Sequence, residues 1–146
     1  MIKVLYIIDC LYADAGGGSE RQILDYYRRC ADYNIDLHIC FLRDQPIHHK
    51  IDWRRPPLTL ETHRLFSVAS VKGLLQVGRY IKQHEIDIVQ TVFDDAAVFG
   101  ALLKRFTMMK VPLIIGLRNA VEVAYMVLNA SVRNKESIGC FFKDDE

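Results

Sequence analysis

The first 29 residues most constrain the fold of this chain. An apolar run, Ile2 to Ile8, leads to three successive glycines, Gly16, Gly17 and Gly18, and then to an amphipathic segment, Gln22 to Arg29. This order predicts a strand, a glycine-rich turn and a helix. Glycines adopt positive φ and place no side chain over a turn, so a ligand could approach main-chain N–H groups at the helix N-terminus. We expect a phosphate or another polar group to bind there.

The start of this first helix has a capping pattern. Ser19 can cap the helix, and Gln22, three residues further on, can complete a capping box. The inward stripe is expected to consist of Ile23, Leu24, Tyr27, Cys30 and Ala31. A tight turn without any ligand remains the alternative for the three glycines, because glycine is the default residue of turns.

Length and composition limit the class of protein. The 146 residues, 51% of them hydrophobic, suit one domain over residues 1–146, because domains of ~100 to 150 residues are the commonest. A formal net charge of +1, with scattered charges, gives no reason to expect a nucleic-acid partner. The four cysteines, Cys10, Cys30, Cys40 and Cys140, lack C-x-x-C spacing, and buried free thiols are expected.

No targeting or membrane segment is expected. Asp9 interrupts the first apolar run, which is too short for a signal peptide, and no run reaches the ~18 apolar residues of a transmembrane segment. The chain is therefore expected to be cytoplasmic, with a peripheral location at the membrane left open.

Strands and helices are predicted to alternate along the chain. After the first helix, strands are expected at Ile35–Leu42, weakly around Leu58–Leu65, and at Ile86–Val92 and Val111–Leu117, with a loop over residues 44–57. The second helix, capped by Ser67 or Ser70, is expected to bury Val71, Leu74, Leu75, Gly78 and Ile81. The third, capped by Asp94 or Asp95, is expected to bury Ala97, Val98, Ala101, Leu102 and Phe106. This alternation predicts an α/β fold, a doubly wound parallel sheet in a Rossmann-like three-layer sandwich with the first strand at its centre.

In such sheets, ligands bind beyond the carboxyl ends of the strands, where the strand order reverses. Besides Gly16 to Gly18, the candidates that follow a strand are Asp44, the segment Phe93–Asp95, and Arg118 with Asn119. Asp94 and Asp95 suit the N-terminus of a helix, and one of them could also accept a hydrogen bond from an acceptor hydroxyl. Arg118 could bind a phosphate or carboxylate, or form a surface ion pair.

Other nucleotide-binding patterns fit less well. The G-x-G-x-x-G fingerprint needs a third glycine where the chain has Arg21, and the acid after the second strand, Asp44, stands 26 residues beyond Gly18. A dinucleotide site is therefore disfavoured, and no Walker phosphate loop occurs.

The histidines and the tryptophan are expected to be structural. His48 and His49 lie in the polar loop, and a zinc site would need two more ligands, so no metal is expected. His38 is expected to be a core or edge histidine with a hydrogen-bond partner. Trp53 with Arg54 and Arg55 could stack on a sugar or nucleotide, although an ordinary loop is the simpler reading.

Three blocks carry a family resemblance: KVLYIID…AGGGSERQILDYYRR, EIDIVQTVFDDAAVFGALLKRF and KVPLIIGLRN. Together they resemble the amino-terminal domain of family 4 glycosyltransferases, retaining enzymes built from two Rossmann-like domains. The match runs from residue 1 to about residue 119, and the tail NASVRNK is similar to a later segment of that domain. Many members have a histidine near the position of Val92 or Phe93, and this chain does not.

The resemblance implies an acceptor-side domain, with the carboxyl-terminal nucleotide-sugar domain absent and the chain incomplete and inactive alone. It implies Gly16, Gly17 and Gly18 as the donor or acceptor loop and Arg118 with Asn119 as cleft residues, while the catalytic residues stay unassigned. The implied partners are a nucleotide sugar, a glycan, lipid or small-molecule acceptor, and the missing domain, with no cofactor. A non-catalytic Rossmann-like module that binds a ligand or partner is the alternative.

Overall fold

The structure, a computed structural model, describes residues 1–11, 18–62, 67–116 and 139–140. The described strands are β1 (Ile2–Ile8), β2 (Ile35–Phe41), β3 (Leu58–Thr59), β4 (Ile88–Val92), β5 (Leu113–Gly116) and β6 (Gly139–Cys140). The helices are α1 (Gly18–Arg29), α2 (Val68–His84) and α3 (Asp94–Thr107), with short 3-10 turns η1 (Cys30–Tyr33) and η2 (Pro46–Lys50).

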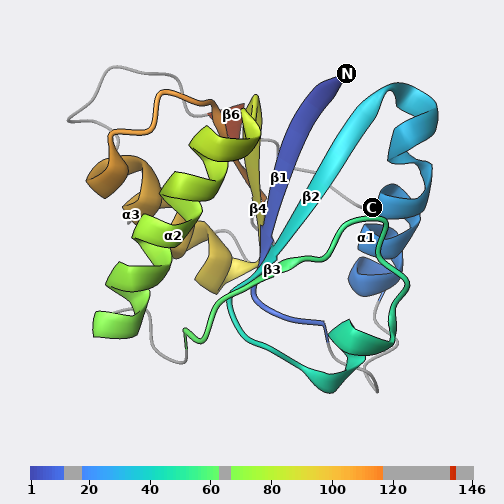
Figure 1. The fold of residues 1–146 in the computed structure, drawn as a ribbon, viewed down its shortest axis with the longest axis horizontal. Coiled ribbons are helices and arrows are strands. Elements are labelled where there is room, and N and C mark those ends of the chain that lie inside the picture. The colour runs from blue at the N-terminus through green and yellow to red at the C-terminus, as the bar shows by residue number, and fades with distance from the viewer. Residues whose placement is uncertain (12–17, 63–66, 117–138, 141–146) are drawn as a thin grey trace.

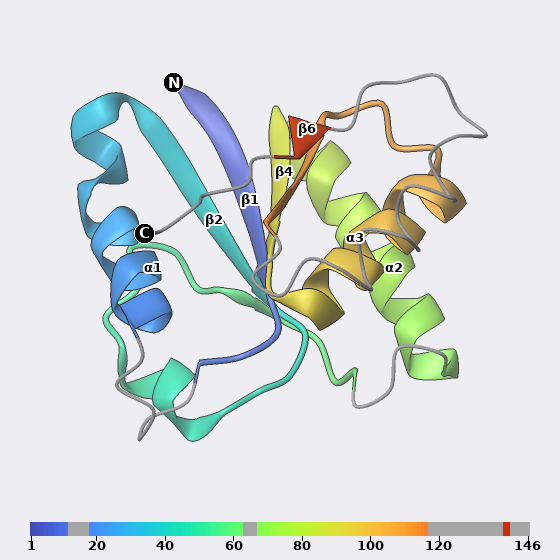
Figure 2. The same ribbon diagram turned by 180° about the vertical axis from the view of Figure 1, so that it is seen from behind.

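The strands form one sheet in the order β3-β2-β1-β4-β5-β6, and every pair is parallel. The central position predicted for β1 is confirmed, because β1 pairs with β2 from Ile2↔Ile35 onward and with β4 from Val4↔Ile88 onward. Helix α1 covers one face of the sheet, and α2 and α3 lie side by side on the other (Figure 1, Figure 2). The fold is the predicted Rossmann-like sandwich.

The core consists of two apolar clusters, one on each face of the sheet. Because side chains alternate along a strand, Leu5 and Ile7 of β1 pack toward α2 and α3, while Ile8 packs toward α1. The predicted inner stripe of α1 is largely correct, with Ile23, Tyr27 and Cys30 buried; Ala31 is exposed. Cys10, Cys30 and Cys40 are buried and form no disulfide bond with one another, as expected.

The predicted inner faces of α2 and α3 are partly wrong. Leu74 and Ile81 are buried as expected, but Val71 and Leu75 are exposed, and so is Phe106 near the end of α3. The residues that α2 buries are Ser70, Gly73, Leu74, Val77 and Ile81. Small residues allow close packing on this face: a Cβ at Gly73 would lie 3.3 Å from Leu60.

Several boundaries also differ from those predicted. The weak strand shrinks to the two residues of β3, β4 and β5 each start two residues later than expected, and the loop over 44–57 contains η2. Ser67 is the N-cap of α2, and its hydroxyl accepts a hydrogen bond from the Ser70 N–H at 3.2 Å, as predicted. Helix α1 begins at Gly18, one residue before the predicted cap Ser19.

Candidate functional site

The order of the strands reverses at β1, whose next strand in sequence, β2, lies on one side and whose crossover partner, β4, lies on the other. The carboxyl ends of β1, β2 and β4 therefore meet at one place on the sheet edge. Asp9 directly follows β1, Arg43 stands two residues beyond the end of β2, and Asp95 lies in the first turn of α3. Ligands of doubly wound folds bind at such a point.

Arg43 joins the three segments at this edge. Its backbone N–H donates to the Asp9 carbonyl at 3.0 Å, which continues the pairing of β1 with β2 past the strand ends. Its Nε lies 3.2 Å from Asp9 Oδ1, and its Nη2 donates to Asp95 Oδ2. The three side chains are 31%, 18% and 41% exposed for Arg43, Asp9 and Asp95, so the group faces solvent only in part.

Carboxyl groups outnumber the arginine in this group. Burial raises the pKa of the Asp9 carboxyl above its usual range, the Arg43 charge acts in the opposite direction, and the Asp95 charge raises it further. One arginine thus lies between two carboxyl groups. Asp94 adds a third carboxyl group, and its Oδ1 is buried without a hydrogen-bond partner in the described part of the structure. The edge therefore offers acceptor oxygens, which suit hydroxyl groups of a ligand.

The turn from β4 into α3 has an unusual backbone. Phe93 is the N-cap of α3 with φ 78° and ψ 164°, and no side chain caps the helix. The expectation that Asp94 or Asp95 caps α3 is therefore wrong: both lie inside the first turn, where their charge still favours the helix dipole. A non-glycine residue at this φ costs on the order of 1–3 kcal/mol, and such residues cluster at functional sites.

His48 fixes the exit from β1. Its ring stacks on Phe41, with centroids 3.6 Å apart and planes inclined by 9°, and its Nε2 accepts a hydrogen bond from the Leu11 N–H at 3.0 Å. The other ring nitrogen, Nδ1, accepts a hydrogen bond from the Gln45 N–H at 3.2 Å and lies 3.4 Å from Asp44 Oδ1. Burial lowers the pKa of His48. The His48 ring thus positions Leu11, the last described residue before the glycine-rich segment.

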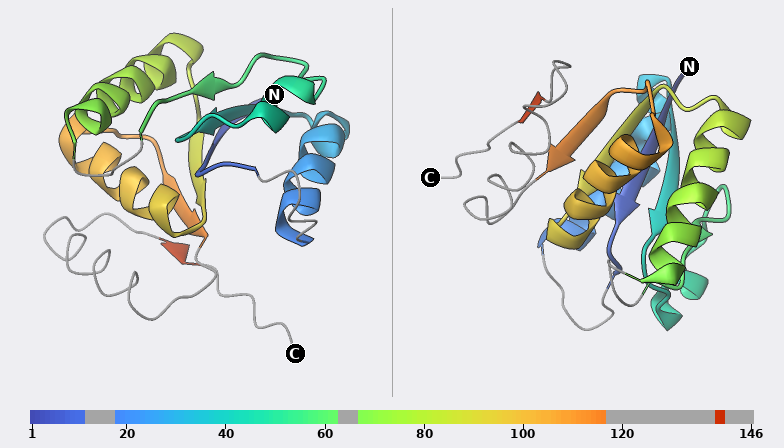
Figure 3. Two further views of the ribbon diagram at one scale, coloured as in Figure 1. Left: turned by 90° about the horizontal axis from the view of Figure 1, so that it is seen from below. Right: turned by 90° about the vertical axis from the view of Figure 1, so that its left-hand side faces the viewer.

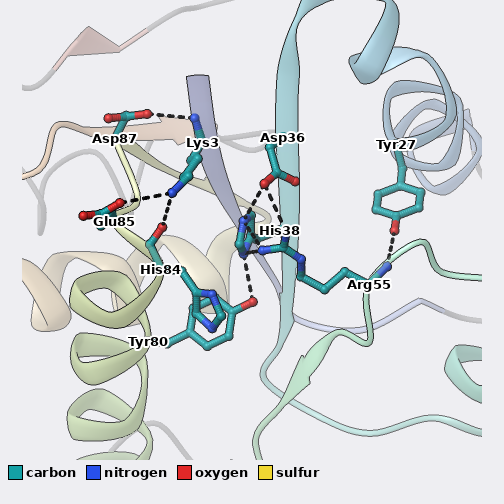
Figure 4. A network of polar contacts seen from close by, with 9 residues as sticks. All are labelled: Lys3, Tyr27, Asp36, His38, Arg55, Tyr80, His84, Glu85 and Asp87. Atoms are coloured by element: carbon teal, nitrogen blue, oxygen red, sulfur yellow. Dashed lines mark hydrogen bonds and ion pairs between the residues drawn. The ribbon is translucent and has the colours of Figure 1, made fainter. Parts of the chain in front are cut away.

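His38, in the middle of β2, belongs to a second polar network (Figure 4). Arg55 Nη1 donates to its Nε2 at 2.6 Å, so the neutral ring carries its proton on Nδ1, which donates to the Tyr80 hydroxyl at 2.9 Å. Burial and then the Arg55 charge lower the pKa of His38. His38 is 1% exposed, so the expectation of a hydrogen-bonded core histidine is confirmed.

The loop around Trp53 is structural. The indole Nε1 donates to the His48 carbonyl at 2.7 Å, and the ring meets Tyr27 edge to face at 4.9 Å. The Arg54 guanidinium lies 5.0 Å from the centre of the Tyr27 ring. These contacts tie the loop between β2 and β3 to α1. An ordinary loop, without a stacked sugar or nucleotide, therefore accounts for these side chains.

Of the predicted site residues, Asp94 and Asp95 lie at the edge described above, and Gly18 is the first residue of α1. Gly16, Gly17, Arg118 and Asn119 lie outside the described residues. Sequence reasoning did not single out Arg43 or the buried role of His48. The position of Arg43 directly after a predicted strand was the available signal for that residue.

Within the described ranges, no group of three or more His, Cys, Asp or Glu side chains could hold a metal ion. In the same ranges, no helix combines the length and apolar character needed to cross a bilayer.

No family model matches this sequence, and no curated protein matches it by sequence. Solved structures do match the fold. MurG from Acinetobacter baumannii is similar with a TM-score of 0.64 and 16% identity over 89% of this chain and 40% of its own. The lipopolysaccharide outer core galactosyltransferase WaaB is similar with a TM-score of 0.61 and 14% identity over 87% of this chain and 37% of its own.

A third similar structure is Anabaena Alr3699/HepE in complex with UDP and glucose, with a TM-score of 0.60 and 16% identity over 91% of this chain and 36% of that one. The chain is similar in fold to part of each of these three structures. At this level of identity the likeness shows a shared fold. The chain spans 36% to 40% of the length of these three proteins.

Proposed function

We propose that this chain is the amino-terminal, acceptor-side half of a family 4 retaining glycosyltransferase, which transfers a sugar from a nucleotide-sugar donor to an acceptor. The observation that carries the proposal is the polar group formed by Arg43, Asp9 and Asp95 at the point where the strand order reverses. Its fold is shared with proteins that include a galactosyltransferase and a structure in complex with UDP and glucose.

The charge of this edge favours an acceptor. Asp9 and Asp95 pair with one arginine on two sides, and Asp94 adds a further carboxyl group at the start of α3, so the described edge repels a diphosphate and attracts hydroxyl groups. The buried, unpaired Oδ1 of Asp94 is the atom we assign to an acceptor hydroxyl.

The donor phosphates are assigned to the glycine-rich segment. Gly16, Gly17 and Gly18 would offer main-chain N–H groups at the start of α1, where the helix dipole stabilises the developing charge of the nucleotide diphosphate leaving group. Arg118 and Asn119, which follow β5, would line the same cleft.

Most donor contacts are assigned to a second domain. The resemblance gives the nucleotide sugar mainly to the carboxyl-terminal domain, which nothing in these 146 residues matches. A few N–H groups, each contributing a net ~0.5 to 1.5 kcal/mol, cannot offset an association cost of about 4 to 15 kcal/mol. The chain alone is therefore expected to bind UDP and GDP sugars with millimolar affinity or weaker, and to transfer no sugar.

Calorimetry with UDP and GDP sugars tests the proposal on the wild type and on Gly17→Val. A valine would cover the N–H groups proposed to bind the ligand and would disfavour the positive φ that the sequence predicts for this turn, so residual binding should vanish. Micromolar binding or measurable transfer by the wild type would contradict the half-enzyme. Equally weak binding by both proteins would mean that the glycine segment does not bind the sugar nucleotide. That result would favour the alternative, a non-catalytic module that binds a ligand or partner.

A further inference from the structure

A segment without regular structure runs along the outer edge of β2. The strand β3 lies at the edge of the sheet beside β2 and pairs with Cys40 and Phe41 at the carboxyl end of β2 (Figure 3). Because β3 runs parallel to β2 and a strand advances about 3.3 Å per residue, the residues before Leu58 lie beside the amino-terminal half of β2. Residues 53–57, here called the strap, therefore pass the part of the β2 edge that β3 does not reach.

Side chains hold the strap in place. Pro56 and Pro57 have no N–H group to donate to the edge of β2, so this part of the strap cannot pair as a regular strand. On the α1 side of the sheet, the Arg55 N–H donates to the Tyr27 hydroxyl at 3.2 Å. On the opposite face, the guanidinium of the same residue reaches His38 (Figure 4). The Arg55 residue thus holds the strap on both sides of β2.

The Arg55 guanidinium bridges two acceptors on β2. Its Nη1 donates to His38 Nε2 at 2.6 Å, and its Nη2 donates to Asp36 Oδ2 at 3.2 Å. Asp36 Oδ2 also lies 3.3 Å from His38 Nε2. A carboxylate and an unprotonated ring nitrogen are both acceptors, so the guanidinium supplies the hydrogen atoms that join them. This bridge needs a neutral His38.

A second proton on His38 removes the bridge. The cationic ring carries an N–H on both nitrogens and accepts no hydrogen bond. Its Nε2–H can donate directly to Asp36 Oδ2, in place of Arg55. Two cations then share one carboxylate around a ring that is 1% exposed, and their repulsion is strong where water is excluded. The Arg55 side chain is 41% exposed, so it is the group that can leave into water.

Other titratable side chains around this network come from β1, from β2, from α2 and from the turn after α2. They are Lys3, Cys40, Tyr80, His84, Glu85 and Asp87. Burial raises the pKa of the Tyr80 hydroxyl and of the Cys40 thiol, so both groups stay neutral near pH 6. The His84 ring lies 5.4 Å from the His38 ring, and a proton on it would add to the repulsion.

The two acids after α2 do not compensate for a charge on His38. Glu85 forms an ion pair with Lys3 at 3.4 Å and is 84% exposed. Asp87 accepts a hydrogen bond from the Lys3 N–H at 2.8 Å. Both acids therefore bind Lys3 of β1, and Asp36 is the carboxylate for which His38 and Arg55 compete.

We propose that Arg55 and His38 form a pH-sensitive latch, which holds the strap across the edge of β2 and opens when His38 takes up a second proton. The open strap uncovers the backbone of the amino-terminal half of β2, and a strand edge of this kind can pair with another chain. The latch uses no residue of the proposed acceptor or donor site, so the two proposals can fail separately.

Opening should become more favourable as the pH falls below about 6.5. In the open strap, His38 titrates near its ordinary pKa of about 6.5. In the closed latch, burial and then the Arg55 charge lower the pKa of His38. Between these two pKa values, the ratio of open to closed molecules should rise by up to about tenfold per pH unit as the pH falls.

Amide hydrogen exchange, measured by NMR on the whole chain between about pH 7.5 and pH 5, tests the latch. The protection factor is the exchange rate of a free amide divided by the measured rate. It should fall by up to about tenfold per pH unit at the amides of Arg55 and of β3. The Val89 N–H, which donates to the Pro112 carbonyl at 2.9 Å, reports opening of the whole sheet. Its protection should stay at least about tenfold higher at each pH.

Two variants separate the latch from other titrations. His38→Gln offers an acceptor to Arg55 and a donor to Tyr80 but binds no proton, so protection of the strap should no longer depend on pH. Arg55→Met removes the bridge, and the strap should exchange at least about threefold faster at neutral pH, again without a pH dependence. His49→Gln is the control, because His49 is exposed and pairs with Asp44 outside the strap. It should keep the wild-type pH dependence.

Three results would overturn the latch. The first is protection at Arg55 that does not change with pH in the wild type. The second is equal protection at Arg55 and Val89 at every pH, which would mean that the strap opens only when the whole sheet does. The third is a wild-type pH dependence in His38→Gln. If that variant does not fold, the same dependence in Arg55→Met would overturn the latch equally.

Discussion

His48 Nε2 accepts a hydrogen bond of 3.0 Å from the backbone N–H of Leu11. This contact ties η2, the turn after β2, to the chain as it leaves β1. His48 and Leu11 are both at most 2% exposed, so water cannot replace the imidazole as the acceptor.

Replacing His48 by leucine should therefore destabilise the protein. The buried Leu11 N–H would lose its acceptor, at a cost of about 1–3 kcal/mol in the free energy of unfolding. Urea unfolding measures this loss. His49→Leu is the control, because His49 is exposed and its contact with Asp44 lies in solvent, where such pairs contribute about 0–1 kcal/mol. Equal losses in the two variants would contradict the anchoring role of His48.

Stability should fall as the pH falls below about 6.5, the usual pKa of histidine. Burial lowers the pKa of both His38 and His48 in the folded protein. Below about pH 6.5 the unfolded chain then binds more protons than the folded chain, and stability is lost until the folded pKa values are passed.

Urea unfolding at several pH values checks this sign. The slope between about pH 7 and pH 5 should be smaller in His38→Gln than in the wild type. The raised pKa of Asp9 acts in the opposite direction, because the folded protein takes up that proton first. A rise in stability through this range would mean that Asp9 outweighs the two histidines.

Removing Arg43 should leave Asp9 and Asp95 without their shared cation. Arg43→Met is expected to lower the free energy of unfolding by about 1–3 kcal/mol at neutral pH and to raise the pKa of Asp9 further. Adding Asp9→Asn should restore part of that loss, since it removes one of the two facing charges. Urea unfolding of the single and double variants measures the coupling, and strictly additive effects would show that these side chains do not interact.

The packing of α3 on β4 leaves no room at Gly100. A Cβ there would lie 2.5 Å from the Cγ2 of the fully buried Thr91, so Gly100→Ala should destabilise the protein by about 1–3 kcal/mol. Thr91→Ser removes that methyl group, and thermal unfolding of Gly100→Ala with Thr91→Ser should show a smaller loss. A stabilised Gly100→Ala variant would mean that α3 lies further from the sheet.

The sheet could be predicted because its central strands carry an unambiguous pattern. β1 is apolar on both faces, and β2 places Ile35, Leu37, Ile39 and Phe41 on the α1 side. The inner face of α2 could not be fixed in the same way. Apolar residues surround that helix, so periodicity allows more than one stripe, and the small residues Ser70 and Gly73 decide which one packs.

The candidate site was only partly accessible to sequence reasoning. That Asp94 and Asp95 follow β4 could be predicted, but the link between Arg43, Asp9 and Asp95 joins segments 34 and 52 residues from Arg43 and depends on the strand register. Phe93 took the N-cap position because its carbonyl accepts the first helical hydrogen bond, from the Ala97 N–H at 2.9 Å. Nothing in its residue type signals a positive φ.

A chemical-shift titration by NMR with a UDP sugar tests the proposed half-enzyme most directly. We expect saturable changes with a millimolar midpoint at the amide groups of Gly16, Gly17 and Gly18, to which the donor phosphates are assigned, and none at the amino edge of the sheet, where β4 and β5 begin. Amide changes confined to the amino edge, or no changes at millimolar ligand, would contradict a nucleotide-sugar cleft at the carboxyl edge.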